Sequence, residues 1–153
     1  MSVSAVIDAD GCPVVRAACR IAHSLGVGCT VVCDTAHIFR SEELFGADVH
    51  IVSQGADSAD LYIVNHVGKE SVVITQDYGL AAMCLAKNAD VIDQNGRIYN
   101  NENISGLLEG RAANKKLLRS GKHPKGAPKR KAEQDKAFEA SFIKLLKEKQ
   151  NGS

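Results

Sequence analysis

With 153 residues and a mass of 16.3 kDa, the chain has the length of one domain with a single sizeable core. Its 44% hydrophobic and 24% charged residues exclude collagen-like, disordered and disulfide-scaffold proteins, and no uncharged stretch reaches the roughly 18 residues of a membrane span. The net charge of +1 hides an asymmetry: residues 1–110 carry 6 Lys and Arg against 14 Asp and Glu (net −8), whereas residues 111–153 carry 13 against 4 (net +9). The basic end indicates an anionic partner, and a nucleic acid is favoured over a membrane surface. The N-terminus lacks the basic region that is typical of signal peptides, which predicts a cytoplasmic protein.

Short runs of β-branched residues alternate with helical patterns over the first 119 residues. The runs predict strands at residues 3–7, 27–33, 49–52, 71–75 and 89–92, with a short extra strand at 97–99. Apolar residues at helical spacing predict helices at 13–25, 57–66, 79–87 and 103–119, and a short helix before residue 49. This alternation predicts an α/β fold, an open and mainly parallel sheet with helices on both faces.

The segment SGKHPKGAPKRK, residues 120–131, combines Gly, Pro and Lys without an apolar period and predicts a basic linker. It separates a domain at residues 1–119 from a final helix at 132–153. One face of that helix carries apolar residues and should pack on the domain: Phe138, Phe142, Leu145 and Leu146. Five cations of the linker are expected to follow a phosphate backbone: Lys122, Lys125, Lys129, Arg130 and Lys131. The alternative is a solvated linker that only offsets the charge of the body.

Acidic residues follow the predicted strands: Asp8, Asp10, Asp57, Asp60, Asp77 and Asp93. Because ligands of an open parallel sheet bind outside the carboxyl ends of its strands, we expect these carboxylates to gather at one edge. Unpaired, they would repel one another and call for a cation, and oxygen ligands favour Mg²⁺ or Mn²⁺. Taken singly, Asp57 or Asp77 could serve only as a helix cap and Asp93 only in a turn, but the set favours a metal site.

Other residue types offer less. The five cysteines contain no C-x-x-C pair, so they predict neither a disulfide framework nor a zinc ribbon. Cys12 lies beside two carboxylates and is not assigned as a nucleophile. His37, after the second strand, is the histidine we consider for substrate contact, because the other histidines in the sheet and helix patterns fit packed or surface positions. The glycine motifs that bind phosphates, G-x-x-x-x-G-K-[ST] and G-x-G-x-x-G, do not occur in the sequence. Their absence argues against a nucleotide cofactor.

Several segments together resemble the YaiI/YqxD family of uncharacterised bacterial proteins: VIDADGCPV, ADSADLYIVNHV, VVITQDYGLAAMCLAKNA, NGRIYNNENI and EQDKAFEASFIKLL. That family is usually placed with PIN-like domains, whose sheet edge carries acidic metal ligands in nucleases, so the resemblance implies a PIN-like fold. By position, its acidic motifs correspond to Asp8 and Asp10, to Asp57 and Asp60, and to Asp77. The match is weaker at Asp93, where related proteins often lack an acid, which leaves a single-metal site or a non-catalytic binder open.

Three functions follow as hypotheses. The first is a metal-dependent ribonuclease-like protein in which Asp8, Asp10, Asp60 and Asp77 hold Mg²⁺ or Mn²⁺ and a metal-bound hydroxide attacks a phosphodiester. The second is an RNA-binding or ribosome-associated module with an inactive acidic pocket.

The third hypothesis takes the D-x-D-G start at Asp8 as that of a haloacid-dehalogenase-type phosphatase, with Asp8 as nucleophile and Asp10 as general acid. Thr75 and Lys87 would belong to its later motifs, and Asp90 and Asp93 would be its metal acids. The proline at position 13, a helix-start signal immediately after the motif, argues against it.

Overall fold

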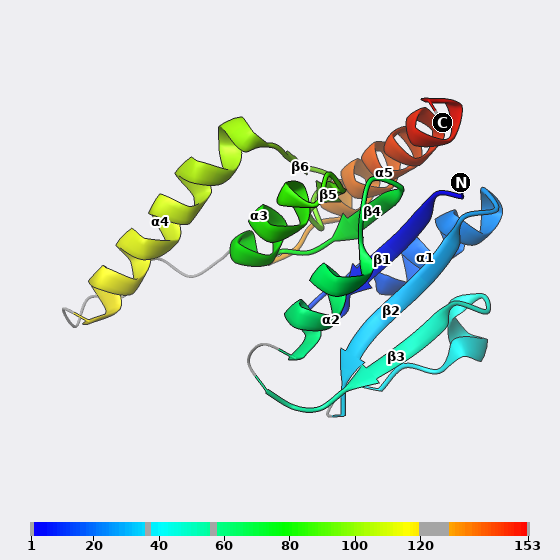
Figure 1. Cartoon of the computed structure of the whole chain (residues 1–153), viewed down its shortest axis with the longest axis horizontal. Helices are drawn as coiled ribbons and strands as arrows, with labels where there is room; N and C mark the ends of the chain where they lie inside the picture. The colour runs from blue at the N-terminus through cyan, green and yellow to red at the C-terminus, as the bar shows by residue number, and fades with distance from the viewer. Residues whose placement is uncertain (1, 36–37, 56–57, 120–128, 153) are drawn as a thin grey trace.

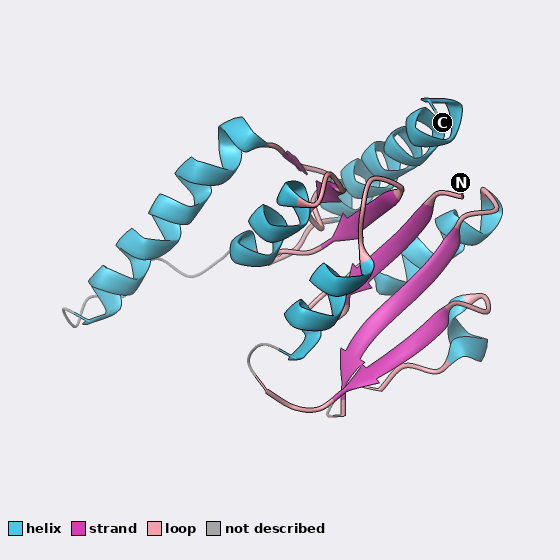
Figure 2. Cartoon of the chain, in the orientation of Figure 1, coloured by secondary structure: helices cyan, strands magenta, loops and turns pink. Residues whose placement is uncertain are grey.

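The computed structural model describes residues 2–35, 38–55, 58–119 and 129–152, with the backbone alone described for residues 111–119. Four candidate residues named above lie outside these ranges: His37, Asp57, Lys122 and Lys125. The predicted α/β class is confirmed, because a mostly parallel sheet carries helices on both of its faces (Figure 2).

Six strands form one sheet in the order β3-β2-β1-β4-β5-β6. They are β1 (Ser4–Asp8), β2 (Gly28–Asp34), β3 (Asp48–Val52), β4 (Ser71–Ile74), β5 (Asp90–Ile92) and β6 (Ile98–Tyr99). Strands β1 to β5 run parallel, and β6 returns antiparallel to β5. The strand order therefore reverses between β1 and β4, which is where open α/β sheets place their ligands.

The helices are α1 (Val15–Ser24), the 3₁₀ turn η1 (Ser41–Leu44), α2 (Ser58–His66), α3 (Tyr78–Ala86), α4 (Asn101–Arg119) and α5 (Ala132–Gly152). The short helix expected before residue 49 is thus one 3₁₀ turn. Figure 1 shows α2 and α3 over one face of the sheet, α1 and α5 behind it, and α4 beside α3 and extending away from the sheet. Within the described ranges, no helix combines the length and the apolarity needed to cross a membrane.

Each face of the sheet has its own apolar core. On one side, Ile7 and Ile74 pack with residues of α1 and with Phe138 and Phe142 of α5. The predicted apolar face of the final helix is confirmed, since Phe138, Phe142, Leu145 and Leu146 are all buried. On the other side, valines of β1, β4 and β5 pack with α2, α3 and the start of α4. Burial of each large side chain contributes about 1.5–3 kcal/mol, so both layers hold the sheet edge in place.

Candidate functional site

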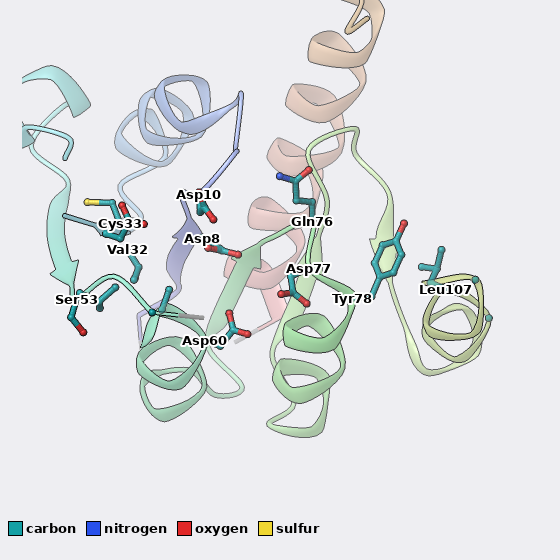
Figure 3. Close-up of a pocket in the computed structure, with 16 residues that line it drawn as sticks. Asp8, Asp10, Val32, Cys33, Ser53, Asp60, Gln76, Asp77, Tyr78 and Leu107 are labelled. Atoms are coloured by element: carbon teal, nitrogen blue, oxygen red, sulfur yellow. The ribbon is translucent and has the colours of Figure 1, made fainter. Parts of the chain in front are cut away.

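A cavity of about 730 Å³ opens at the carboxyl ends of the first four strands (Figure 3). Its lining comes from β1, β2, β3, the starts of α2 and α3, and α4. Four of the predicted acids line it: Asp8, Asp10, Asp60 and Asp77. They come from three segments of the chain, since Asp8 and Asp10 are two residues apart, and they converge where the strand order reverses, at the edge that the sequence predicts.

Asp8 is the last residue of β1 and is buried, with 9% of its surface exposed. Burial raises the pKa of its carboxyl group from 3.8 to about 6, against the opposing effect of a hydrogen bond from Thr75. The neighbouring carboxylates of Asp60, Asp77 and Asp10 raise the pKa further, in that order. Burial is thus the main cause of the raised pKa and the neighbouring charges add to it, and a cation bound beside Asp8 would favour the ionised carboxylate.

Thr75 joins the two central strands at this edge, where the sequence suggested it only for a later motif of the phosphatase hypothesis. Its hydroxyl donates a hydrogen bond to Oδ2 of Asp8 at 2.8 Å, and its Oγ1 accepts one from the backbone N–H of Asp77 at 3.0 Å. The side chain is 2% exposed, so both bonds are shielded from water. The Thr75 hydroxyl thus orients two acids: it binds the carboxyl group of Asp8 and the backbone N–H of Asp77. The sequence signal for this supporting role was its place at the end of the fourth predicted strand.

Asp77 has two roles. Its Oδ1 accepts hydrogen bonds from the backbone N–H groups of Gly79 (2.9 Å) and Leu80 (3.2 Å), which makes it the N-cap of α3. The interpretation of Asp77 as a helix cap is therefore correct, but it describes only one of its two roles. Asp77 also lines the cavity, so capping fixes the orientation of a site residue.

The loops that follow β1 and β4 are tied together beside the acids. Nε2 of Gln76 donates a hydrogen bond to the carbonyl oxygen of Gly11 at 3.1 Å. Gly11 has a φ of +66°, which favours glycine, and a Cβ there would lie 2.8 Å from the same nitrogen, so a larger residue would displace the Gln76 side chain. The contact holds the loop that carries Asp10 close to the loop that carries Asp77.

Asp34 is a fifth acid on the cavity, and the sequence analysis did not select it. It ends β2 as Asp8 ends β1, and the two strands are parallel neighbours. The signal was available, because Asp34 follows the second predicted strand within the segment CDTAHIF.

Asp93 lies elsewhere, contrary to its assignment as a metal ligand. It is not among the residues that line the cavity. Its Oδ1 accepts hydrogen bonds from the backbone N–H groups of Asn95 (2.8 Å) and Arg97 (2.9 Å), which closes the turn between β5 and β6. The turn interpretation therefore holds, because local backbone donors already engage this carboxylate.

The phosphatase hypothesis loses its proposed metal acids for the same reason. Asp90 begins β5, at the end of the sheet opposite Asp8, and its Oδ2 accepts a hydrogen bond from Nζ of Lys149 on α5 at 2.8 Å. Neither Asp90 nor Asp93 lines the cavity. The two acids that the phosphatase hypothesis requires as metal ligands therefore lie away from Asp8.

The described acids of the cavity are the type of ligand that a hard divalent cation prefers, but their side chains are not already placed around one point. Five carboxylates line one cavity, and oxygen donors are what Mg²⁺ and Mn²⁺ prefer. Yet within the described ranges, no group of three or more His, Cys, Asp or Glu side chains is already arranged around a point that could hold an ion. An ion would therefore draw the carboxylates together.

The cysteines add no nucleophile to the site. Burial raises the pKa of the Cys12 thiol to about 11, and the charge of Asp8 acts in the same direction. A thiol with this pKa stays protonated at neutral pH, where it is a poor nucleophile. Every cysteine of the chain is a free thiol, consistent with the expectation of no disulfide framework.

Arg130 differs from the expectation of a free cation. Its guanidinium donates hydrogen bonds of 2.7 Å to Oδ1 of Asp135, to Oδ1 of Asn95 and to the carbonyl oxygen of Gln94. It therefore attaches the start of α5 to the turn after β5. A guanidinium fork suits such multiple acceptors, which sequence composition alone does not reveal. Lys129 and Lys131 flank it and are exposed.

The fold and the cavity together define an α/β protein with an acidic site at the point where its parallel sheet reverses strand order. Residues 6–148 match the family described as "Uncharacterized BCR, YaiI/YqxD family". The chain belongs to this family, as the resemblance predicted.

Curated relatives extend over nearly the whole chain. A UPF0178 protein of Exiguobacterium sibiricum is 47% identical over 143 residues, covering 94% of this chain and 96% of its own. A UPF0178 protein of Clostridium acetobutylicum is 43% identical, with 92% and 94% covered, and one of Bacillus cereus is 36% identical, with 92% and 96% covered. No solved structure matches the chain at a significant level.

Proposed function

We propose that this protein is a divalent-metal-dependent phosphodiesterase of PIN-like type that acts on RNA. One observation carries the proposal: Asp8 and Asp10 at the end of β1, Asp60 on α2 and Asp77 at the start of α3 line a single cavity where the strand order reverses. A structural role for each acid alone does not explain why the set converges on open space. The raised pKa of Asp8, which is caused mainly by burial and further by the charges of the neighbouring carboxylates, is typical of a functional site.

The same four residues would hold Mg²⁺ or Mn²⁺. When bound, such an ion neutralises phosphate charge and activates a water molecule for attack on a phosphodiester. The chain's own contribution is orientation: Thr75 holds the Asp8 carboxyl group, the capping of α3 holds Asp77, and the contact between Gln76 and Gly11 holds the loop of Asp10.

The choice of a nucleic acid as substrate rests on charge. The acidic body would repel a polyanion, whereas residues 111–153 carry a net charge of +9. The exposed Lys129 and Lys131 lie directly before α5, next to the Arg130 contact with the turn after β5. A basic segment attached beside the site-bearing end of the sheet would favour binding of an RNA that the cavity could act on.

Metal binding and RNA cleavage by the full chain test this proposal. We expect calorimetry to detect Mn²⁺ binding, and Asp77→Asn to weaken it by more than the roughly 10- to 100-fold that loss of a supporting residue costs. RNA cleavage should fall in parallel. The matched control is Asp93→Asn, at the end of a neighbouring strand but outside the cavity, which should leave both measurements near the parental values. Absence of binding of either ion, or cleavage by Asp77→Asn at the parental rate, would contradict the proposal.

The second candidate is a non-catalytic RNA-binding module. It is favoured by the lack, among the described residues, of three acidic, histidine or cysteine side chains already arranged for an ion. Under this alternative, RNA affinity persists while no divalent ion supports cleavage. The experiment above therefore separates the two functions.

A further inference from the structure

The cavity extends beyond the four carboxylates, and its α4 side is apolar. Figure 3 shows Asp8, Asp10, Asp60 and Asp77 in the middle of the view, with Tyr78 and then Leu107 on one side of them. Leu107 belongs to α4, and Tyr78 is the first residue of α3. A volume of about 730 Å³ is in the range of pockets that enclose a whole small organic ligand, much more than a phosphate group and an ion require.

The Tyr78 ring is held in place at this wall. It makes an edge contact with the ring of Tyr99, with centroids 6.1 Å apart and planes at 67°. Tyr99 is 2% exposed, so Tyr78 rests on a buried aromatic neighbour while it remains half-buried at the cavity. An aromatic ring fixed in this way provides a flat surface without a large loss of side-chain freedom on binding.

The α4 wall leaves room beside that ring. Gly106 and Gly110, four residues apart on the same helix, also line the cavity. A Cβ on either glycine would meet no atom within 4 Å, so packing against the described residues does not require glycine there. Neither residue has a positive φ. Glycine destabilises a helix relative to other residues. The two glycines on the cavity face of α4 therefore reduce its stability and leave the cavity wall open where side chains would otherwise project.

We propose that Tyr78 and the α4 wall at Leu107 form a nucleobase subsite, and that the base next to the scissile phosphate of single-stranded RNA stacks there. The placement of this base next to a scissile phosphate rests on the proposed phosphodiesterase function, whereas the binding of a base at the subsite does not. An aromatic ring beside a phosphate-directed site suits a nucleotide, because every base has a face that can stack. Bases within a duplex are already stacked on their neighbours, so the subsite selects unpaired RNA.

The test measures the binding of a short single-stranded RNA to the full chain by fluorescence anisotropy, with and without Mn²⁺. Tyr78→Ala should weaken binding by about 5- to 150-fold, the range found for loss of one stacked base. Tyr78→Phe keeps the ring and should stay within about twofold of the parent. The matched control is Tyr62→Ala, a half-exposed tyrosine on α2 that stacks between His50 and His66 outside the cavity and should leave RNA affinity unchanged.

A strand scan with abasic nucleotides provides a readout that a merely structural role of Tyr78 would not change. When the base that stacks on Tyr78 is removed, the parent should bind the strand more weakly than it binds the intact strand. Tyr78→Ala should bind the intact and the abasic strand with the same affinity. A second variant, Gly106→Leu, fills the open space without meeting a described neighbour at its Cβ, so it should fold and still weaken binding of the complete strand. The same RNA annealed to its complement should bind the parent more weakly and be insensitive to Tyr78→Ala.

The outcomes separate the two proposals. Binding that depends on Tyr78 and on one base, without cleavage under any divalent ion, supports the subsite and contradicts the phosphodiesterase function. Cleavage with equal affinity of the parent, Tyr78→Ala and Gly106→Leu supports the function and overturns the subsite. Equal loss of affinity for intact and abasic strands would also overturn it, since the ring would then act on the fold or the backbone and not on a base.

Discussion

The carboxyl group of Asp8 makes the stability of the protein depend on pH. Its pKa is higher in the folded state, about 6, than the ordinary value of 3.8. A carboxyl group with this sign of shift stabilises the folded state least when it is ionised. The folded state is therefore penalised progressively as the pH rises from about 4 through about 6, and it is relieved below that window.

We expect Asp8→Asn to become the more stable protein, relative to the parent, as the pH increases. With a chelator present, the difference in unfolding free energy between the two should grow by about 2–3 kcal/mol from about pH 4 to about pH 8. Denaturant titrations at both pH values measure it. A difference that stays constant with pH would show that Asp8 titrates normally in the folded state.

Thr75 supports two acids at once, so its hydroxyl is more important than its size. Thr75→Val keeps the shape but removes the donor to Asp8 and the acceptor for the backbone N–H of Asp77. Because both groups lie in a water-poor environment, we expect a loss of about 1–3 kcal/mol in unfolding free energy near neutral pH. Chemical denaturation of Thr75→Val and of Thr75→Ser, which retains the hydroxyl, measures the effect. Equal stability of the two variants would refute the role given to the hydroxyl.

At the scale of elements, α5 depends on the turn between β5 and β6. Ser141 donates a hydrogen bond from Oγ to the carbonyl oxygen of Gly96 at 2.7 Å, and Arg130 attaches to the preceding two residues. Gly96 has a φ of +89°, and a Cβ at this position would lie 2.6 Å from the carbonyl oxygen of Ala137. The helix and the turn therefore approach as closely as a glycine permits.

Gly96→Ala should loosen this contact. A left-handed backbone and a clash with the α5 backbone together predict a loss of about 2–4 kcal/mol in unfolding free energy. The matched control is Gly68→Ala, where φ is not positive and a Cβ would meet no atom within 4 Å, so the change should be within about 0.5 kcal/mol. Thermal unfolding and limited proteolysis of α5 in both variants test the difference. Similar behaviour of the two would mean that α5 adjusts without cost.

At the scale of the whole molecule, an acidic body of net −8 is joined to a basic end of net +9. The two parts are predicted to have different partners, a divalent cation for the body and a phosphate backbone for the end. The structure divides the basic end further, because Arg130 is engaged within the molecule and Lys129 and Lys131 are exposed.

Replacing four lysines of the basic segment by Gln should therefore flatten the salt dependence of RNA binding: Lys122, Lys125, Lys129 and Lys131. If each neutralises one phosphate of a single strand, the logarithmic slope changes by about 0.7 per residue, about 2.8 in total. Divalent-ion binding should not change. Filter-binding or anisotropy titrations over a range of salt concentrations measure the slope. An unchanged slope would identify the segment as a solvated linker.

Arg130→Gln is the contrasting variant. Removing the guanidinium should leave the salt slope nearly unchanged and lower the unfolding free energy by about 1–3 kcal/mol, because one hydrogen bond to Asp135 of α5 and two to the turn after β5 are lost. Parallel salt titrations and denaturation curves provide both values. A lower slope with unaltered stability would restore Arg130 to the RNA-binding cations.

The sequence by itself determined the class of fold and the edge that carries the site. The strands could be predicted because Val and Ile runs form buried strands locally, and their observed bounds differ by a residue or so from the predicted ones. The final helix could be predicted because its apolar residues repeat with the helical period. Asp8, Asp10, Asp60 and Asp77 could be proposed together because the carboxyl ends of parallel strands share one edge.

Only the tertiary structure decided which acids converge and what holds them. Strand order is not encoded locally, so the pairing of β1 with β4, which brings Thr75 to Asp8 across 67 positions, could not be derived from spacing. The same order places Asp34 on the cavity and leaves Asp93 to its turn. Arg130 was misjudged because a cation in a segment without apolar period gives no sign of the acceptors that folding brings to it. Local periods specify elements, whereas the partners of a polar side chain depend on contacts that exist only once the chain has folded.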